Sequence, residues 1–421
     1  MPKSTKTPAA RNPDKPAKPH PDFPLFPHAT KRWAKKVRGK LHYFGPWAEP
    51  EKALELWLAQ KDDLLAGMTP TPALGKLTIR DLVNHFLTAK KRRVDTGELA
   101  GRSFFDYHAT CERVIEVFGR TKPVDHLSPS DFDKLRSKLA EGRGPTTFGN
   151  DVQRVKVLFK HGFDAGLIDR PVRFGADFKK PSAKTLRKQR QAKGPRMFEA
   201  ADLRRIIGAA GVPLKAMILL GINAGFGNND IAKLPMSAVN LETGWLDFPR
   251  PKTAVHRRCW LWPETVKALR AAISERPNAK NPADAWLVFV TKYGARWSKG
   301  DSITVEKNDK DGGAYTIKGN TSNPLSHEFA KLLTTLGIKR NGLNFYALRH
   351  VFATIAGESR DQVAVNAIMG HAPASNDMAS VYRERISDDR LQAVSEFVRQ
   401  WLLTNGRTPD EKQPEGGWTL A

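Results

Sequence analysis

The feature that most constrains this chain is a basic stretch near its middle, residues 179–196, with the sequence KKPSAKTLRKQRQAKGPR. It contains eight Lys and Arg residues, no Asp or Glu, and too few apolar residues to pack into a core. Such a composition is typical of a linker. At 421 residues the chain has room for two or three domains, so the stretch predicts separate domains before and after it.

The charge of the whole chain points in the same direction as the linker. There are 69 Lys and Arg residues against 44 Asp and Glu, a formal net charge of +25. This excess favours a polyanionic partner, nucleic acid above all, although ribosome-associated and membrane-surface proteins share it. Within the linker, one interpretation is that it only keeps the junction soluble. The other is that it follows a DNA backbone, with these contacts: Lys179, Lys180, Arg187, Lys188 and Arg190.

Cysteine content and the N-terminal sequence indicate in which cellular compartment the protein is expected. Cys111 and Cys259 are the only cysteines, too few for a disulfide framework or a cysteine-based zinc site, which suits a reducing environment. The N-terminus lacks the apolar core of a signal peptide, and no apolar run approaches the length of a membrane span. These features predict a cytoplasmic protein with no membrane partner.

Two segments precede the helical part of the chain. Residues 1–25 are rich in Pro, Lys and Ala, which predicts a disordered basic arm. Residues 26–70 alternate basic with aromatic or apolar residues and then become amphipathic, which predicts a minidomain of two or three strands and one helix. Arg32, Lys35 and Lys36 lie on its expected basic face and are candidate DNA contacts. The alternative is a hairpin that binds no ligand.

Residues 77–178 have apolar residues at helical spacing throughout. The pattern predicts four helices in a compact all-α domain. Ser128 or Ser130 is expected to cap the third helix, and Gly142 and Gly144 are expected to break the chain before the fourth.

Residues 197–402 mix helical patterns with a few strands, and residues 403–421 are expected to be disordered. A hairpin is predicted over residues 244–262, where apolar residues alternate on both sides of a Pro-Lys-Thr turn, and a short strand is predicted at WLVFV, residues 286–290. The remaining segments predict an α+β domain of mostly helices with a small antiparallel sheet.

Three residues near the C-terminus suggest chemistry. Arg349, in NFYALRHVFATIAG, lies on an otherwise apolar helix, so its guanidinium must meet an anion or a structural carboxylate. In IMGHAPASNDMASVYRERI, His371 follows a glycine that is expected to end a helix, and Tyr382 lies within a short helix. Each of these residues, taken singly, is compatible with an ordinary structural role.

Taken together, R-H-x-F-A-T, then M-G-H, then a tyrosine about ten residues later resemble the C-terminal signature of the tyrosine recombinases, also called the phage integrase family. The resemblance covers most of the chain and implies a multidomain, mainly α protein: an arm-binding-like domain, a core-binding domain and a catalytic domain. It implies a site-specific recombinase, the integrase of a mobile element, acting on double-stranded DNA as a homotetramer. The family's chemistry needs no metal or nucleotide cofactor.

The resemblance also implies roles for single residues. Tyr382 would attack the scissile phosphorus and form a covalent 3′-phosphotyrosyl bond, Arg349 would be the second arginine of a phosphate clamp, and His371 would assist. Lys252, in the hairpin turn, would be the general acid toward the leaving 5′-hydroxyl. Two other functions stay open: a DNA-binding or architectural protein that has lost cleavage, and a type IB topoisomerase-like enzyme.

Two positions depart from the family pattern. The elbow INAGFGNNDIAKL, taken alone, suits either a phosphate-holding loop or a plain turn in which Asn or Asp caps the next helix. Against the family pattern, Gly227 stands where the first clamp arginine is expected. Tyr346 replaces the histidine of H-x-x-R, and its phenol can hydrogen-bond a phosphate oxygen but is no imidazole base. Arg257 and Arg258 are the nearest candidates for a substitute cation, unless they are solvated strand residues or backbone contacts.

Overall fold

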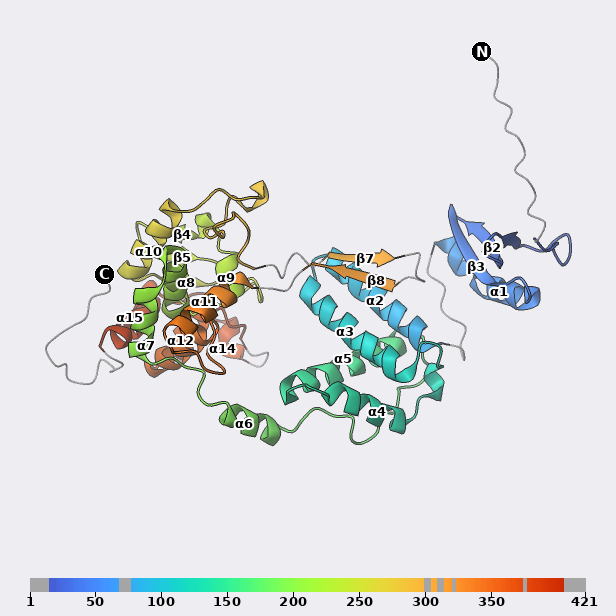
Figure 1. The fold of residues 1–421 in the computed structure, drawn as a ribbon, viewed down its shortest axis with the longest axis horizontal. Helices are drawn as coiled ribbons and strands as arrows, with labels where there is room; N and C mark the ends of the chain where they lie inside the picture. The colour runs from blue at the N-terminus through green and yellow to red at the C-terminus, as the bar shows by residue number, and fades with distance from the viewer. Residues whose placement is uncertain are drawn as a thin grey trace, which may run out of the picture. The chain divides into compact units, whose positions relative to one another are not determined.

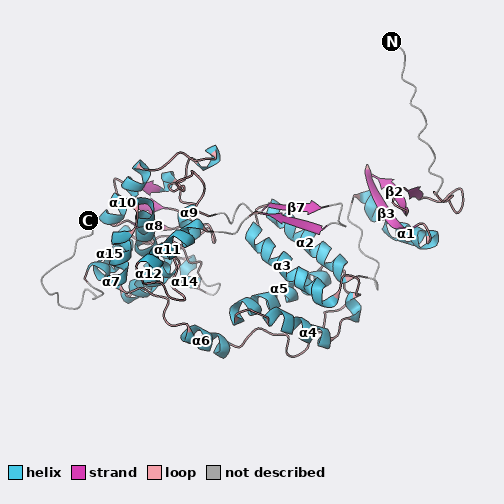
Figure 2. Cartoon of the chain, viewed as in Figure 1, coloured by secondary structure: helices cyan, strands magenta, loops and turns pink. Residues whose placement is uncertain are grey.

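The computed structural model describes residues 15–67, 77–298, 304–308, 314–319, 323–373 and 377–404. Internal contacts divide the chain into two compact units: Met1–Thr96 with Asp106–Pro181, and Gly97–Phe105 with Ser182–Ala421. The described part is mainly helical and contains three small antiparallel sheets, as the predicted fold class requires (Figures 1 and 2). None of its helices combines the length and the apolar character that crossing a membrane needs.

The predicted minidomain is confirmed as a three-stranded sheet followed by a helix: β1 (Phe26–His28), β2 (Arg32–Val37), β3 (Lys40–Pro46) and α1 (Pro50–Ala66). The expectation that all of residues 1–25 are disordered is wrong at its C-terminal end. Phe23 and Leu25 are buried in the minidomain core, where Phe23 packs edge-on against Trp33, because the sheet leaves apolar surface that they cover. Residues 1–14 lie outside the described residues.

The four helices predicted for the next domain are confirmed as α2 (Ile79–Asp95), α3 (Gly101–Phe118), α4 (Pro129–Ala140) and α5 (Pro145–Asp164), with a short η1 (Val124–His126). Of the two candidate caps, Ser128 is the N-cap of α4, and its backbone N–H donates to Asp131. Gly142 adopts a positive φ, and Gly144 is the N-cap of α5. The two glycines therefore break the chain where predicted.

The predicted linker contains a helix that the sequence did not suggest. Helix α6 (Ala183–Ala192) is N-capped by Ser182, whose Oγ accepts a hydrogen bond from the Thr185 N–H at 3.1 Å. No residue of α6 is buried. A helix without an apolar stripe carries no periodic signal, which is why the pattern indicated only a linker.

The C-terminal domain is built mostly from helices. They are α7 (Ala200–Ala209), α8 (Val212–Asn223), α9 (Asn228–Ala232), α10 (Pro263–Ser274), α11 (Pro324–Thr335), α12 (Ala347–Glu358), α13 (Gln362–Met369), α14 (Met378–Val381) and α15 (Asp388–Leu403), with η2 (Met236–Ala238) and η3 (Pro282–Asp284). Helix α8 is the centre of the core, since Ala216 to Asn223 are all buried and α7, α10, α12 and α15 contact it.

Two small sheets complete this domain. Their strands are β4 (Val239–Asn240), β5 (Trp245–Asp247) and β6 (Arg258–Trp260) in one, and β7 (Thr304–Asn308) and β8 (Ala314–Lys318) in the other. The predicted hairpin is confirmed as β5 and β6. The strand predicted at residues 286–290 is wrong: Leu287 forms a single bridge with Pro235, and a proline cannot donate to a longer ladder.

Candidate active site

Arg349 lies on α12 and is 3% exposed. Its Nη1 donates to the carbonyl oxygen of Gly225, and its Nη2 donates to the carbonyl oxygen of Met369 at 2.8 Å. Burial lowers the pKa of Arg349, and the nearby Arg250 lowers it further. Among the described residues, no carboxylate forms a salt bridge with this guanidinium, so the structural ion pair considered from the sequence is not what holds it.

His371 is directly joined to Arg349. Its Nε2 lies 2.9 Å from Nη2 of Arg349, and its Nδ1 lies 3.3 Å from Oδ1 of Asn366. Because a guanidinium only donates, Nε2 must be the accepting nitrogen, and the ring proton is therefore on Nδ1, facing the Asn366 amide oxygen. Burial lowers the pKa of His371, and the charges of Arg349 and Arg250 add to this effect, which favours the neutral ring.

Two glycines with positive φ allow this arrangement. Gly225 has φ of +62°, and a Cβ there would lie 2.9 Å from the Phe352 ring. Gly370 also has φ of +62°, and a Cβ there would lie 2.9 Å from Cβ of Arg250. A side chain at either position would be strained and would push apart the elements that surround Arg349.

The hairpin turn lies beside the His371 segment. Thr253 Oγ1 donates to the carbonyl oxygen of Gly370 at 3.1 Å, and Arg250 Nη1 approaches the same oxygen at 3.4 Å. Lys252, the predicted general acid, is exposed in the turn between these two residues. The turn therefore brings the lysine to the neighbourhood of His371, and its ammonium group is free to meet solvent or a ligand.

At the elbow the chain turns into α9, but the N-cap is a glycine rather than the Asn or Asp that the turn interpretation expected. Gly227 is the N-cap of α9, and its N–H donates to Oδ2 of Asp230 at 2.8 Å. Tyr346 covers this glycine, since a Cβ on Gly227 would lie 3.2 Å from the Tyr346 ring. Gly227 and Tyr346, the two positions that depart from the family pattern, are thus neighbours, and the Tyr346 ring lies over Gly227.

The two hairpin arginines point in opposite directions. Arg258 is ion-paired at the surface with Asp247 at 2.6 Å and with Asp388 at 2.8 Å. Arg257 turns inward, and its guanidinium carbon lies 3.8 Å from the centre of the Phe226 ring, beside Gly227. The sequence analysis treated the two arginines alike, and the structure separates them, since neighbouring residues of an extended chain face opposite sides.

Arg250 is a member of this site that the sequence analysis missed. It is half-buried, and its charge acts on both Arg349 and His371. The available signal was its position in the predicted hairpin, two residues before Lys252. That signal is weak, because the register of a hairpin decides which of its residues face inward.

Tyr382 is not brought together with Arg349 in this structure. It follows α14, is 76% exposed, and has no hydrogen bond to another described residue. The DNA-contact candidates are mostly exposed as well: Lys179, Lys180, Arg187, Lys188, Arg190, Arg32 and Lys36. Lys35 differs, since its Nζ donates to the carbonyl oxygen of Pro24 at 2.8 Å and lies 5.5 Å from the Trp57 ring.

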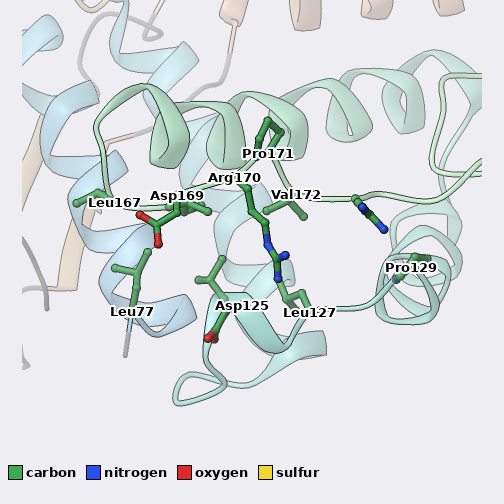
Figure 3. A pocket seen from close by; sticks show the side chains of 12 residues that line it. Leu77, Asp125, Leu127, Pro129, Leu167, Asp169, Arg170, Pro171 and Val172 are labelled. Carbon is green, nitrogen blue, oxygen red and sulfur yellow. The ribbon is translucent and has the colours of Figure 1, made fainter. Parts of the chain in front are cut away.

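A cavity of about 540 Å³ lies in the helical domain rather than at the arginines. Figure 3 shows Leu77 and Leu127 on its wall with the Arg170 side chain extending across it. None of the predicted catalytic residues lines this cavity. This cavity therefore gives no support to a role of the helical domain in the predicted chemistry.

Comparison with known proteins identifies the C-terminal domain. Residues 194–386 match the model of the phage integrase family. The match begins at the end of the basic linker and includes the elbow, the hairpin, Arg349, His371 and Tyr382. No curated protein matches the sequence.

Solved structures match over a longer part of the chain. A lambda integrase dimer bound to a COC′ core site is 13% identical, with a TM-score of 0.52 over 90% of this chain and 99% of that chain. A lambda integrase tetramer bound to a Holliday junction is 13% identical, with a TM-score of 0.53 over 88% and 98%. The Tn1549 transposon integrase in complex with transposon right end DNA is 17% identical, with a TM-score of 0.52 over 76% and 99%. At these identities the likeness is one of fold.

Proposed function

Residues 194–386 of this chain belong to the phage integrase family, the tyrosine recombinases, and from this membership we propose that the protein cuts and rejoins DNA site-specifically through a covalent phosphotyrosyl intermediate. The observation that carries the proposal is the contact between the buried Arg349 and the exposed His371. A guanidinium held by two carbonyl oxygens and one imidazole, without a carboxylate among the described residues, keeps its charge available for an anion.

In the proposed reaction, Arg349 binds the non-bridging oxygens of the scissile phosphate. The phenolic oxygen of Tyr382, which is exposed to solvent, passes its proton to water as it attacks phosphorus. The P–O5′ bond breaks, and the leaving 5′-oxygen takes a proton from Lys252, which regains one from solvent. A neutral His371 keeps Nε2 as an acceptor and thereby fixes the orientation of the guanidinium. Because Tyr382 is exposed and apart from Arg349, DNA must bring the phosphate to both residues.

Double-stranded DNA is the proposed partner, and a homotetramer on DNA is the proposed assembly. The formal charge of +25 and the exposed basic face of α6 support DNA binding. The matched structures include a lambda integrase tetramer on a Holliday junction and a transposon integrase on transposon DNA. These likenesses support an integrase of a mobile element.

One observation favours a second function, a DNA-binding protein that has lost cleavage. Gly227 lacks the cation that the family pattern places there, and removal of one such contact typically slows a reaction by about 10²–10³-fold. A protein with this defect alone would still bind DNA through its basic surfaces. The two functions differ in whether a covalent adduct forms.

The deciding experiment is an adduct assay with nicked duplexes from the ends of the DNA element that carries the gene. Cleavage beside the nick releases a short strand and traps the covalent protein–DNA adduct. We expect adducts from the unmodified chain and none from Tyr382→Phe, with DNA affinity nearly unchanged because only one hydroxyl is lost. Tyr293→Phe is the matched control, since Tyr293 is 75% exposed in the same unit. Undiminished adducts from Tyr382→Phe would remove Tyr382 from the nucleophile's role.

A further inference from the structure

Arg257 contacts a residue that precedes Gly227 in the sequence and a residue that follows it. Its guanidinium stacks on Phe226, the residue before Gly227, at 3.8 Å. Its Nη1 lies 3.6 Å from Oδ2 of Asp230, the same oxygen that accepts the Gly227 N–H. An arginine side chain that starts on the hairpin therefore ends beside the backbone position at which the family pattern expects an arginine.

The hydrogen-bonding capacity of this guanidinium is mostly unused. Nε donates to the carbonyl oxygen of Phe248 at 3.1 Å. Within the described part of the chain, Nη1 and Nη2 of Arg257 have no hydrogen-bond partner, although the side chain is 0% exposed. The contact with Asp230 is an ion pair that is too long to be a hydrogen bond. Buried donors of this kind are costly, so an acceptor that reached Nη1 and Nη2 would be bound favourably.

The local charge points to the same acceptor. The charges of Arg250 and Arg257 both lower the pKa of Arg349, and Arg250 also lowers the pKa of Arg257, while the carboxylate of Asp230 acts in the opposite direction on both. Nε of Arg250 is also buried without a hydrogen-bond partner among the described residues. Of these arginines, Arg257 is ion-paired with Asp230 at 3.6 Å, and the positive charge of the group exceeds the negative charge of this one carboxylate. An oxyanion with several acceptor oxygens would neutralise the excess. A phosphodiester has this charge and these acceptors.

We propose that Arg257 is a phosphate-binding residue that supplies, from the hairpin, the cation missing at Gly227. This inference rests on the proposed recombinase function and specifies its phosphate site. The burial of Arg257 does not count against it, because Arg349 is itself only 3% exposed in the DNA-free chain. The Tyr346 ring occupies the space that a side chain at position 227 would enter. The positive charge therefore comes from Arg257 on the hairpin and not from a side chain at position 227.

The test compares Arg257→Met with Arg258→Met. The two arginines are neighbours on the same hairpin arm, and Arg258 forms surface ion pairs with Asp247 and Asp388. Adduct formation per folded molecule should fall by about 10²–10³-fold in Arg257→Met and change little in Arg258→Met. Arg257→Gln, which keeps a donor for Phe248 but no charge, should show the same loss, and it replaces the methionine variant if that variant does not fold. An adduct rate near that of the unmodified chain in either folded Arg257 variant would overturn the proposal.

A second measurement separates this inference from the proposed function. Inorganic phosphate is titrated into the DNA-free chain by calorimetry, against sodium chloride of equal ionic strength. We expect binding in the unmodified chain and in Arg258→Met, and at least about tenfold weaker binding in Arg257→Gln. If the unmodified chain forms no adduct but Arg257→Gln still loses phosphate binding, the recombinase function fails and the anion site stands. Equal phosphate binding in Arg257→Gln and the unmodified chain would overturn the assignment of Arg257.

Discussion

Two regions of this molecule gather arginines around a single buried carboxylate, and they do so with opposite results. In the helical domain, Asp151 is 1% exposed and is bound by Arg143 at 2.5 Å and by Arg154 at 2.9 Å, while Thr110 donates to it at 3.2 Å. Arg154 also reaches Asp106 at 2.8 Å. We call this group the closed cluster, because the buried acceptor is fully used.

The C-terminal domain holds the open cluster: Asp230, Arg250, Arg257 and Arg349. Here Arg257 and Arg349 are buried together with Asp230, and the donors Nε of Arg250 and both Nη atoms of Arg257 have no hydrogen-bond partner among the described residues. The closed cluster has its requirements met within the chain and is explained by stability alone. The open cluster is explained by a ligand, since unmet buried donors cost stability until an acceptor arrives.

The largest expected effect is in the open cluster. Arg349→Ala should slow adduct formation on the order of 10²-fold or more, because the phosphate loses a charge-assisted contact. The thermal midpoint should also fall, since the change leaves a cavity and removes the donor from the carbonyl oxygens of Gly225 and Met369. The measurement is the adduct rate per folded molecule together with thermal unfolding. A normal rate with reduced stability would make Arg349 a structural residue and break the comparison.

The closed cluster should respond in stability alone. Asp151→Asn removes the charge that Arg143 and Arg154 share, and loss of one partner from a buried ion pair costs about 3 kcal/mol. The fraction that remains folded should form adducts at the rate of the unmodified chain. The measurement is urea unfolding of the full chain together with the adduct rate. Slowed adduct formation without lost stability would place Asp151 in the function.

The helices that hold the two clusters were predictable from the sequence, but the side-chain packing that distinguishes the open cluster was not. Helical spacing predicted the four helices around Asp151, the helix that carries Arg349 and the helix that ends just before His371, because apolar periodicity reports burial directly. Spacing does not report which of two adjacent hairpin arginines turns inward. It does not report that Arg250 faces His371, or that the Tyr346 ring lies on Gly227. These facts depend on how distant segments pack.

The third prediction concerns that packing of Tyr346 on Gly227. Gly227→Arg should lower adduct formation by roughly tenfold, because its Cβ would lie 3.2 Å from the Tyr346 ring and its charge would compete with Arg257 for Asp230. The backbone itself permits the change, since φ at Gly227 is −90°.

The triple variant Gly227→Arg, Tyr346→His, Arg257→Gln supplies the control for this change. It restores the family pattern at both positions and removes the hairpin cation, so it should recover adduct formation relative to Gly227→Arg. An increase with Gly227→Arg alone would mean that the space is empty and that Arg257 supplies no cation there.

The smallest expected effect is one of pH on the helical domain. His85 on α2 and His161 on α5 are joined by a hydrogen bond of 3.0 Å between Nδ1 and Nε2, which requires one ring to accept. Burial lowers the pKa of both rings, with smaller contributions from Arg92 on His85 and from His85 and Lys90 on His161. The unfolded chain therefore binds more protons than the folded chain as pH falls below about 6.5.

Stability should accordingly be complete above pH 6.5 and decline on acidification, by about 4 °C or less in the thermal midpoint. Hydrogen exchange of the α2 and α5 amides in the full chain, compared between pH 7.5 and pH 5.5, should report the same loss locally after correction for intrinsic exchange rates. His161→Gln keeps a hydrogen-bonding group that does not titrate, so it should reduce this pH dependence. His126→Gln, at an exposed histidine of the same domain, should not. If His161→Gln left the pH dependence intact, the loss would have to come from the carboxylates of the closed cluster, and that cluster would be the acid-sensitive part of the domain.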